Sequence, residues 1–217
     1  MFNVDKAIKL QLRLSQIAFE ETEKAPSLGL NNIRYIAGFD SSYSGNTQYA
    51  VAVVYDIENN VICERAYAIV EVKVPYIPGL LAFREIPGYM RAFNKLRTPI
   101  DLVMVDGHGL SHPRAFGIAS HLGLVLNKPS IGVAKKYLYG EIVKIGDRRF
   151  IKTRGKIVGE IINHENTELY LSIGFGIKLE DAVEIARKLL KPGIKLPIPI
   201  HEADKYSKQI KRKYVKN

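Results

Sequence analysis

The chain has 217 residues, with 32 Lys and Arg against 22 Asp and Glu, a formal net charge of +10 and a pI near 9.5. Hydrophobic residues at 47% and charged residues at 25% exclude a wholly disordered protein. The single cysteine, Cys63, excludes an internal disulfide and a cysteine-based zinc cluster.

The basic balance predicts a polyanionic partner, nucleic acid first, because a chain of this charge is attracted to polyanions whatever its fold. A basic surface that serves only solubility is the alternative. The sequence contains no apolar leader and no apolar run of about 18 residues, which predicts a soluble, cytoplasmic protein with no membrane segment.

The length is typical of one compact α/β domain covering residues 1–217. Apolar residues at helical spacing predict an N-terminal helix over about residues 1–25. Three apolar runs at 35–39, 49–55 and 61–72 are joined by short turns, which predicts an antiparallel meander.

The second half alternates between strand and helix patterns. Prolines at 75 and 78 predict a rigid loop, since each fixes its own φ and extends the residue before it. The elements predicted after this loop are a helix from 80 to 97 interrupted at Pro87-Gly88, a strand at 101–105, a helix at 114–126, a strand at 130–134, further strands within 139–173, a helix at 179–190, and a basic tail at 203–217. The fold class is therefore α/β, a mixed sheet in which an antiparallel meander is followed by parallel strands, flanked by helices.

Two aspartates, Asp40 and Asp106, each follow an apolar strand in this scheme. If the two strands are parallel neighbours, both carboxylates emerge at the same edge of the sheet, where open α/β sheets bind ligands. Carboxylates this close repel unless a cation lies between them, and hard oxygen ligands favour Mg²⁺ or Mn²⁺. Glu85 is a third acid within reach, and Lys135, after the strand at 130–134, is expected at the same edge.

The segment from Asp106 to Pro113 contains two glycines and the histidines His108 and His112. The glycines allow the backbone to approach a ligand closely. A zinc site is the alternative, but Gly109 and Pro113 argue against one continuous helix presenting both imidazoles. His112 is expected to form a hydrogen bond or to contact a phosphate.

The chain resembles the endonuclease V family, the deoxyinosine 3′ endonucleases, over roughly residues 30–200. The resemblance rests on Gly-Phe-Asp-Ser-Ser-Tyr ending at Tyr43, Pro-Tyr-Ile-Pro-Gly-Leu-Leu-Ala-Phe-Arg-Glu ending at Glu85, Val-Asp-Gly-His-Gly ending at Gly109, His-Pro-Arg ending at Arg114, and Gly-Val-Ala-Lys ending at Lys135. It implies a ribonuclease H-like core and a DNA repair enzyme using Mg²⁺ or Mn²⁺. It also implies hydrolysis of the second phosphodiester bond 3′ to deoxyinosine, leaving 3′-hydroxyl and 5′-phosphate ends.

The same resemblance implies roles for individual residues. Asp40, Glu85 and Asp106 would be metal-site acids, with His112 and Lys135 as active-site partners of the phosphate or water. A wedge that replaces the displaced base would comprise Pro75, Tyr76, Ile77 and Pro78. A base pocket, acting largely through backbone groups, would comprise Leu81, Gly107, Gly109 and Gly132.

One departure from the family pattern is Ser172-Ile173-Gly174-Phe175, where many bacterial members have Ser-Pro-Gly-His. His201 lies near the position of a late histidine in the family, whereas His121 and His164 are expected to be structural or exposed. Three functions stay open: a DNA endonuclease acting on deoxyinosine as a monomer, an inosine-specific endoribonuclease or RNA-binding module of the same fold, and a ribonuclease H-like nuclease with another substrate. The basic tail is either a solvated terminus or an arm that follows phosphates.

Overall fold

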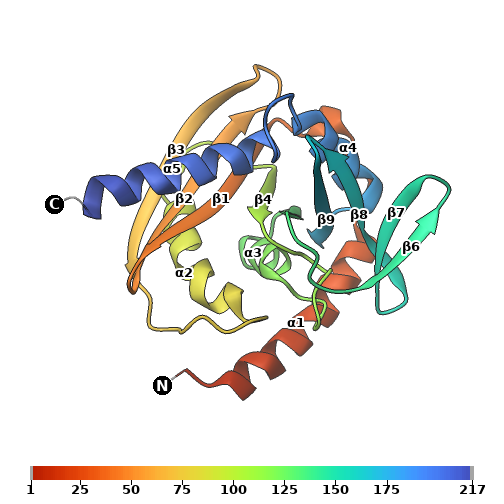
Figure 1. The fold of residues 1–217 in the computed structure, drawn as a ribbon, viewed down its shortest axis with the longest axis horizontal. Helices are drawn as coiled ribbons and strands as arrows, with labels where there is room; N and C mark the ends of the chain where they lie inside the picture. The colour runs from red at the N-terminus through yellow and green to blue at the C-terminus, as the bar shows by residue number, and fades with distance from the viewer. Residues whose placement is uncertain (1, 216–217) are drawn as a thin grey trace.

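The structure is a computed structural model that describes residues 2–215. Nine strands form one mixed sheet in the order β3-β2-β1-β4-β5-β9-β8-β7-β6 (Figure 1). The strands are β1 (Tyr35–Ser44), β2 (Thr47–Asp56), β3 (Val61–Glu71), β4 (Leu102–Asp106), β5 (Ser130–Ala134), β6 (Glu141–Ile145), β7 (Arg148–Thr153), β8 (Lys156–His164) and β9 (Thr167–Phe175). Strands β1 to β3 form the expected meander, β4 and β5 continue it in parallel with β1, and β9 to β6 complete the sheet in antiparallel pairs.

Helices cover both faces of the sheet (Figure 1). They are α1 (Val4–Lys24), the short 3-10 helix η1 (Leu30–Asn32), α2 (Leu81–Phe93), α3 (Ile118–Leu126), α4 (Leu179–Leu189) and α5 (Ile198–Val215). Helix α5 crosses β1 and β2 on one face, where α4 also lies against β8 and β9, while α2 and α3 pack on the other face. Among the helices described, none is both long and apolar enough to cross a membrane.

Because side chains alternate along the strands, the core is divided between the two faces of the sheet. Ala37 and Phe39 of β1 pack with α2 and α3, whereas Ile36 belongs to the cluster on the α4 and α5 side. Because alternate residues of a strand face opposite sides, Asp40 lies on the α5 face. Ser207 of α5 contacts it directly.

Several boundaries differ from the sequence-based expectation, including the end of α2 at Phe93 and not at 97. Strand β1 continues to Ser44, so Asp40 lies inside a strand and not after it. Helix α2 runs through Pro87-Gly88 without interruption, and a Cβ on Gly88 would lie 2.3 Å from Oε1 of Gln48. The glycine therefore allows α2 to approach β2, a tertiary requirement that local propensity does not reveal. Helix α3 begins at Ile118 and not at 114, because the preceding residues form turns with Ala115 at φ 51°.

The C-terminal segment is not a frayed tail. Helix α5 begins at Ile198 and buries Ala203, Ser207 and Ile210 against the sheet. Gly38 of β1 makes this contact close, since a Cβ there would lie 2.1 Å from the carbonyl oxygen of Pro199. The basic residues of this segment are therefore carried on a rigid helix, except Lys216, which lies outside the described residues.

Candidate active site

Strand pairing brings the two aspartates together. Phe39 of β1 is aligned with Val105 of β4 in parallel register, so Asp40 and Asp106 each come one residue later on adjacent strands. Lys135 follows β5, the other parallel neighbour of β4, and its Nζ lies 3.2 Å from Oδ2 of Asp106. The structure therefore brings Asp40, Asp106 and Lys135 together beside the carboxyl end of β4, with Asp40 inside β1 and not at the edge of the sheet.

The carboxylate of Asp40 is held from α5. Ser207, which is fully buried, donates a hydrogen bond of 2.7 Å to Oδ2 of Asp40. Burial raises the pKa of Asp40 to about 6, with further increases from the charges of Asp106 and Asp204 and an opposing effect of the Ser207 bond. Burial also raises the pKa of Asp106, against the effect of Lys135.

Glu85 comes from the opposite layer, on α2. It is 9% exposed and accepts hydrogen bonds from the hydroxyls of Tyr89 at 2.9 Å and Tyr43 at 3.2 Å. Burial raises the pKa of Glu85 to about 7, and the negative charges of Asp40 and Asp106 raise it further. The charges of Asp40 and Asp106 therefore disfavour ionised Glu85, and the charge of Asp106 also disfavours ionised Asp40.

These acids fit a hard divalent cation in the chemistry of their donors. All three supply carboxylate oxygens, and a cation would relieve the repulsion that raises the pKa values of Asp40 and Glu85. Within residues 2–215, however, no group of three or more Asp, Glu, His or Cys side chains is arranged to hold a metal ion as the side chains lie here. His108 and His112 of the zinc alternative likewise belong to no such group among the described residues.

Asp204 is an acid that the sequence analysis missed. It lies on α5, one turn before Lys208, and its charge raises the pKa values of both Asp40 and Asp106. The sequence gives no local signal for this role, because 204 falls in a polar, basic stretch that resembles a solvated end. Only the packing of α5 across β1 brings it to the acidic cluster.

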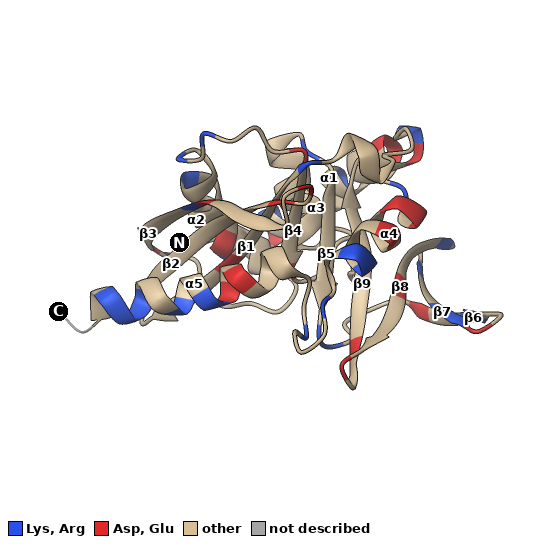
Figure 2. Ribbon diagram, turned by 90° about the horizontal axis from the view of Figure 1, so that it is seen from above, with Lys and Arg blue, Asp and Glu red and all other residues tan. Residues whose placement is uncertain are grey.

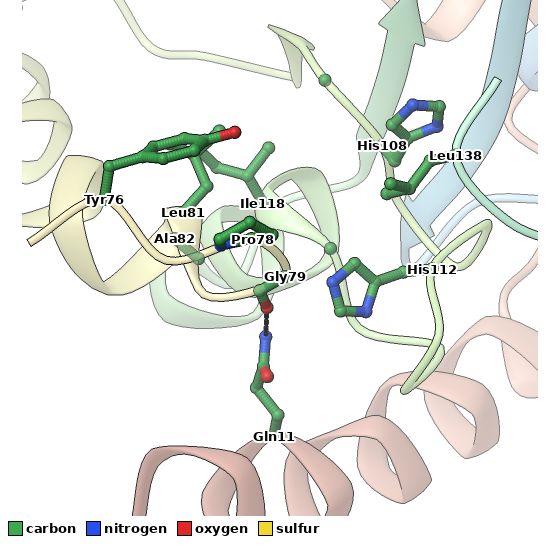
Figure 3. Close-up of a pocket in the computed structure, with 12 residues that line it drawn as sticks. Gln11, Tyr76, Pro78, Gly79, Leu81, Ala82, His108, His112, Ile118 and Leu138 are labelled. Atoms are coloured by element: carbon green, nitrogen blue, oxygen red, sulfur yellow. Dashed lines mark hydrogen bonds between the residues drawn. The ribbon is translucent and has the colours of Figure 1, made fainter. Parts of the chain in front are cut away.

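A cavity of about 220 Å³ opens beside the loop that follows β4 (Figure 3). Its lining residues are Gln11, Tyr76, Pro78, Gly79, Leu81, Ala82, Gly107, His108, His112, Gly117, Ile118 and Leu138. Figure 3 shows Tyr76, Pro78 and Leu81 on one side of this cavity and His108, His112 and Leu138 on the other. Tyr76 is 68% exposed, so the tip of the proline-rich loop projects into solvent at the mouth of the cavity.

The end of the proline-rich loop is held by the N-terminal helix. Gln11 of α1 is 1% exposed, and its side-chain amide donates to the carbonyl oxygens of Gly79 at 3.0 Å and Phe116 at 3.2 Å. Arg114 donates to the same Gly79 oxygen and to Oε1 of Gln11, each at 2.6 Å. The sequence analysis did not identify Gln11, whose only local feature is a polar side chain on the buried face of α1.

The structure places His112 in the cavity wall. The backbone N–H of Arg114 donates to its Nδ1 at 3.2 Å, and burial lowers the pKa of this imidazole to about 4. The ring is therefore neutral at pH 7 and carries its proton on Nε2, which faces the Gly79 segment. His112 thus lines the cavity, and among the described residues no charge effect or contact links it to the acidic cluster.

Of the four expected pocket residues, Leu81 and Gly107 line the cavity, whereas Gly109 and Gly132 support its floor. A Cβ on Gly132 would lie 2.5 Å from the Gly107 oxygen, and one on Gly109 would lie 2.1 Å from the oxygen of Ile173. Both glycines allow the 107–109 loop to rest directly on the sheet. Ser172, from the segment that departs from the family pattern, fixes this loop by accepting the N–H of Gly109 at 2.8 Å.

The remaining histidines have structural surroundings. His121 packs between Phe83 and Phe116, and Nε2 of His164 lies 2.9 Å from the carbonyl oxygen of Ile194. His201 lies on α5 one turn before Asp204, and it is Asp204 whose charge acts on the acidic cluster. The expectation for His121 and His164 is confirmed.

The family model described as endonuclease V matches residues 15–205 of the chain. Among curated relatives, endonuclease V of Desulfurococcus amylolyticus is 48% identical over 208 residues, covering 95% of each chain. Endonuclease V of Sulfolobus acidocaldarius is 39% identical and covers 91% of this chain and 93% of its own.

Solved structures give the same relationship. The crystal structure of endonuclease V from Bacillus subtilis superposes with a TM-score of 0.88 at 27% identity, covering 100% of this chain and 95% of the other. A Ciona intestinalis endonuclease V, in complex with a 23mer DNA containing an inosine followed by a ribo-adenosine, has the same fold, with a TM-score of 0.80 at 23% identity and coverage of 98% and 99%. The fold is ribonuclease H-like, as expected. The chain belongs to the endonuclease V family.

Proposed function

We propose that this chain is a DNA repair endonuclease that hydrolyses the second phosphodiester bond 3′ to deoxyinosine with Mg²⁺ or Mn²⁺, acting as a monomer. The observation that carries the proposal is that the acidic cluster of Asp40, Asp106 and Glu85 connects to a cavity of about 220 Å³ through Gly107, which follows Asp106 and lines the cavity. A base held in the cavity would present a nearby phosphodiester to the acids. The Ciona intestinalis relative crystallised with inosine-containing DNA supports this choice of substrate.

Asp40, Asp106 and Glu85 would hold the divalent ion, with Asp204 beside them. A divalent cation bound there supplies charge neutralisation at the phosphate and lowers the pKa of an attacking water. Lys135 is half exposed and already contacts Asp106, so its ammonium can also reach a phosphate oxygen on which charge develops. The hydrogen bond from Ser207 to Oδ2 would keep the Asp40 carboxylate in one orientation.

The cavity would select the base. Hypoxanthine presents a carbonyl O6 and an N1–H where adenine presents an amino group and an acceptor, so fixed donors and acceptors reject adenine by leaving groups unpaired. The backbone of Gly107 and the neutral ring of His112 are such fixed groups. The loop from Pro75 to Pro78 would fill the space left by the displaced base, and its prolines reduce the entropy lost on insertion.

The test is cleavage of a duplex with one deoxyinosine opposite thymine, labelled at either end of the cut strand. We expect one nick at the second bond 3′ to the lesion with Mg²⁺, and none with EDTA. Asp40→Ala and Asp106→Ala should bind the duplex without cutting it, while Glu184→Gln, an exposed acid on α4, should cut normally. Undiminished nicking by both aspartate variants would contradict the assignment.

The same assay separates the other candidates. Faster cleavage of a single-stranded RNA containing inosine would indicate an endoribonuclease, and binding of that RNA without product would indicate a binding module. Equal cleavage of branched substrates without inosine would indicate a ribonuclease H-like nuclease of another specificity.

A further inference from the structure

The C-terminal half of α5 carries only positive charge. From residue 205 to 215 the sequence contains no acid and five cations, which are Lys205, Lys208, Lys211, Arg212 and Lys213. Figure 2 shows acidic residues on α5 near β1 and basic residues along the half that leads to the C-terminus. This helix therefore begins at the acidic cluster and becomes uniformly basic as it leaves it.

The rotation of α5 about its axis is fixed by its buried residues. Ala203, Ser207 and Ile210 face the sheet, and Ser207 donates to Asp40. At about 100° per residue, Asp204, Lys208 and Lys211 then share one flank of the helix. The opposite flank packs toward β3, where Glu202 pairs with Arg65 at 3.4 Å.

The flank with Lys208 faces the active site. The charges of Asp204 and Lys208 both act on Asp106, the last residue of β4. Arg212 follows Lys208 by one turn and is exposed, so Lys208, Lys211 and Arg212 form a basic row that starts beside the catalytic acids. From 208 to 212 the helix advances about 6 Å, which corresponds to about two nucleotides at 3.4 Å per nucleotide of one strand.

Part of this charge has no partner among the residues that the structure describes. Lys205 pairs with Glu202 at 2.8 Å and Lys208 pairs with Asp204 at 2.6 Å. Within residues 2–215, by contrast, Lys211 and Arg212 form no ion pair. Neighbouring cations on one helix repel each other, which an anionic strand lying along them would relieve.

We propose that the basic row of Lys208, Lys211 and Arg212 binds the phosphate backbone of the substrate strand on the 3′ side of the scissile bond. The direction follows from the layers of the fold. The cavity lies with α2 and α3 on one face, the acids lie at the edge of the sheet, and α5 lies on the other face. A strand that places its inosine in the cavity and its scissile phosphate at the acids continues along α5.

The assignment of α5 to the 3′ side of the scissile bond rests on the proposed function. The test is chosen so that failure of this assignment and failure of the proposed function give different results. The variant is Lys211→Gln with Arg212→Gln, which removes two charges and keeps good helix formers at positions outside the buried face. The control is Lys188→Gln with Lys195→Gln, which removes the same charge from exposed positions in and after α4. Equal thermal unfolding of all three proteins establishes that the substitutions leave the fold intact.

Binding of an inosine-containing duplex is measured without divalent ions between about 50 and 200 mM salt. We expect the α5 variant to bind more weakly, with a log–log salt slope smaller in magnitude by about two, since each phosphate that the protein no longer neutralises reduces the slope by about 0.9. Trimming the substrate strand to one nucleotide 3′ of the scissile bond should abolish the difference, whereas trimming its 5′ side should preserve it. The control should match the unsubstituted chain.

An unchanged salt slope, or a difference that persists on the 3′-trimmed duplex, would overturn the assignment of α5. Failure of the proposed function would be seen separately, as an unsubstituted chain that binds the duplex but does not cut beside inosine. The salt slopes of the two variants still report on α5 in that case, because they require binding and not cleavage.

Discussion

Glu85 would hold the metal ion in the proposed catalysis, whereas its buried charge is expected to destabilise the metal-free fold. Replacing it tests this electrostatic account of the site. Its carboxylate is 9% exposed, and burial together with the charges of Asp40 and Asp106 raises its pKa to about 7. Glu85→Gln removes this charge with almost no change in shape. We therefore expect the variant not to cut the inosine duplex in Mg²⁺. In the metal-free protein at pH 8 we expect it to be more stable than the unsubstituted chain.

The magnitude follows from the pKa. Folding raises the pKa of Glu85 from an ordinary 4.5 to about 7. At a pH where Glu85 is ionised in both the folded and the unfolded state, this shift lowers the free energy of unfolding by about 3 kcal/mol. The glutamine cannot satisfy both Tyr43 and Tyr89 as well as a carboxylate does, which costs about 1 kcal/mol. The net gain at pH 8 is then about 2 kcal/mol.

The sign of the pH dependence is also determined. The folded state binds this proton more tightly than the unfolded state, so the stabilising contribution of protonated Glu85 is complete below about pH 4.5 and disappears as the pH rises through 7. The gain in stability of Glu85→Gln over the unsubstituted chain should therefore appear as the pH rises from 4.5 to 7, and it should be absent at pH 4.5 and below.

Urea denaturation at pH 4.5 and pH 8, in EDTA and in Mg²⁺, measures these differences. Glu184→Gln, an exposed acid on α4, is the matched control and should show no comparable pH-dependent gain. Added Mg²⁺ at pH 8 should stabilise the unsubstituted chain more than Glu85→Gln. A variant no more stable than the parent at pH 8, or one with the same gain at both pH values, would refute the reasoning.

Three further predictions concern the elements that hold the site. Gln11→Met removes the hydrogen bonds to the carbonyl oxygens of Phe116 and Gly79, so it should lower the free energy of unfolding by about 2 kcal/mol and reduce the ratio of inosine to adenine cleavage. An unchanged ratio would show that Gln11 does not position the proline-rich loop. Gly38→Ala places a Cβ 2.1 Å from the Pro199 oxygen, so it should displace α5 and lower the free energy of unfolding, measured by urea denaturation, by several kcal/mol. Gly29→Ala, where a Cβ would have no neighbouring atom within 4 Å, should leave the free energy of unfolding unchanged. Ser207→Ala removes the donor to Asp40 and should raise the pKa of that carboxyl above about 6 in an NMR titration of the metal-free protein; a lower value would contradict the assigned hydrogen bond.

Much of the fold could be predicted because it is encoded locally. The apolar runs of β1, β4 and β5 are continuous, as buried strands require, and each is followed or interrupted by one charged residue of the site. Parallel pairing of these three strands leaves few other arrangements, and it brings Asp40, Asp106 and Lys135 together. The proline-rich loop was predictable for the same reason, since proline restricts the backbone whatever surrounds it.

The remaining features depend on contacts between distant parts of the chain. Pro87-Gly88 resembles a helix break, but α2 continues because Gly88 fits against Gln48 of β2. Asp204 lies in a segment that resembles a solvated tail, and it joins the acids only because Gly38 lets α5 pack onto β1.

Local sequence thus determined the strands, the loop and the identity of the strand-borne acids, because these follow from side-chain periodicity and backbone restriction. Tertiary packing alone decided that His112 lines the cavity, that α1 holds the loop through Gln11, and that α5 supplies Ser207 and Asp204. Each of these depends on close approach between elements tens of residues apart, which neither composition nor spacing records.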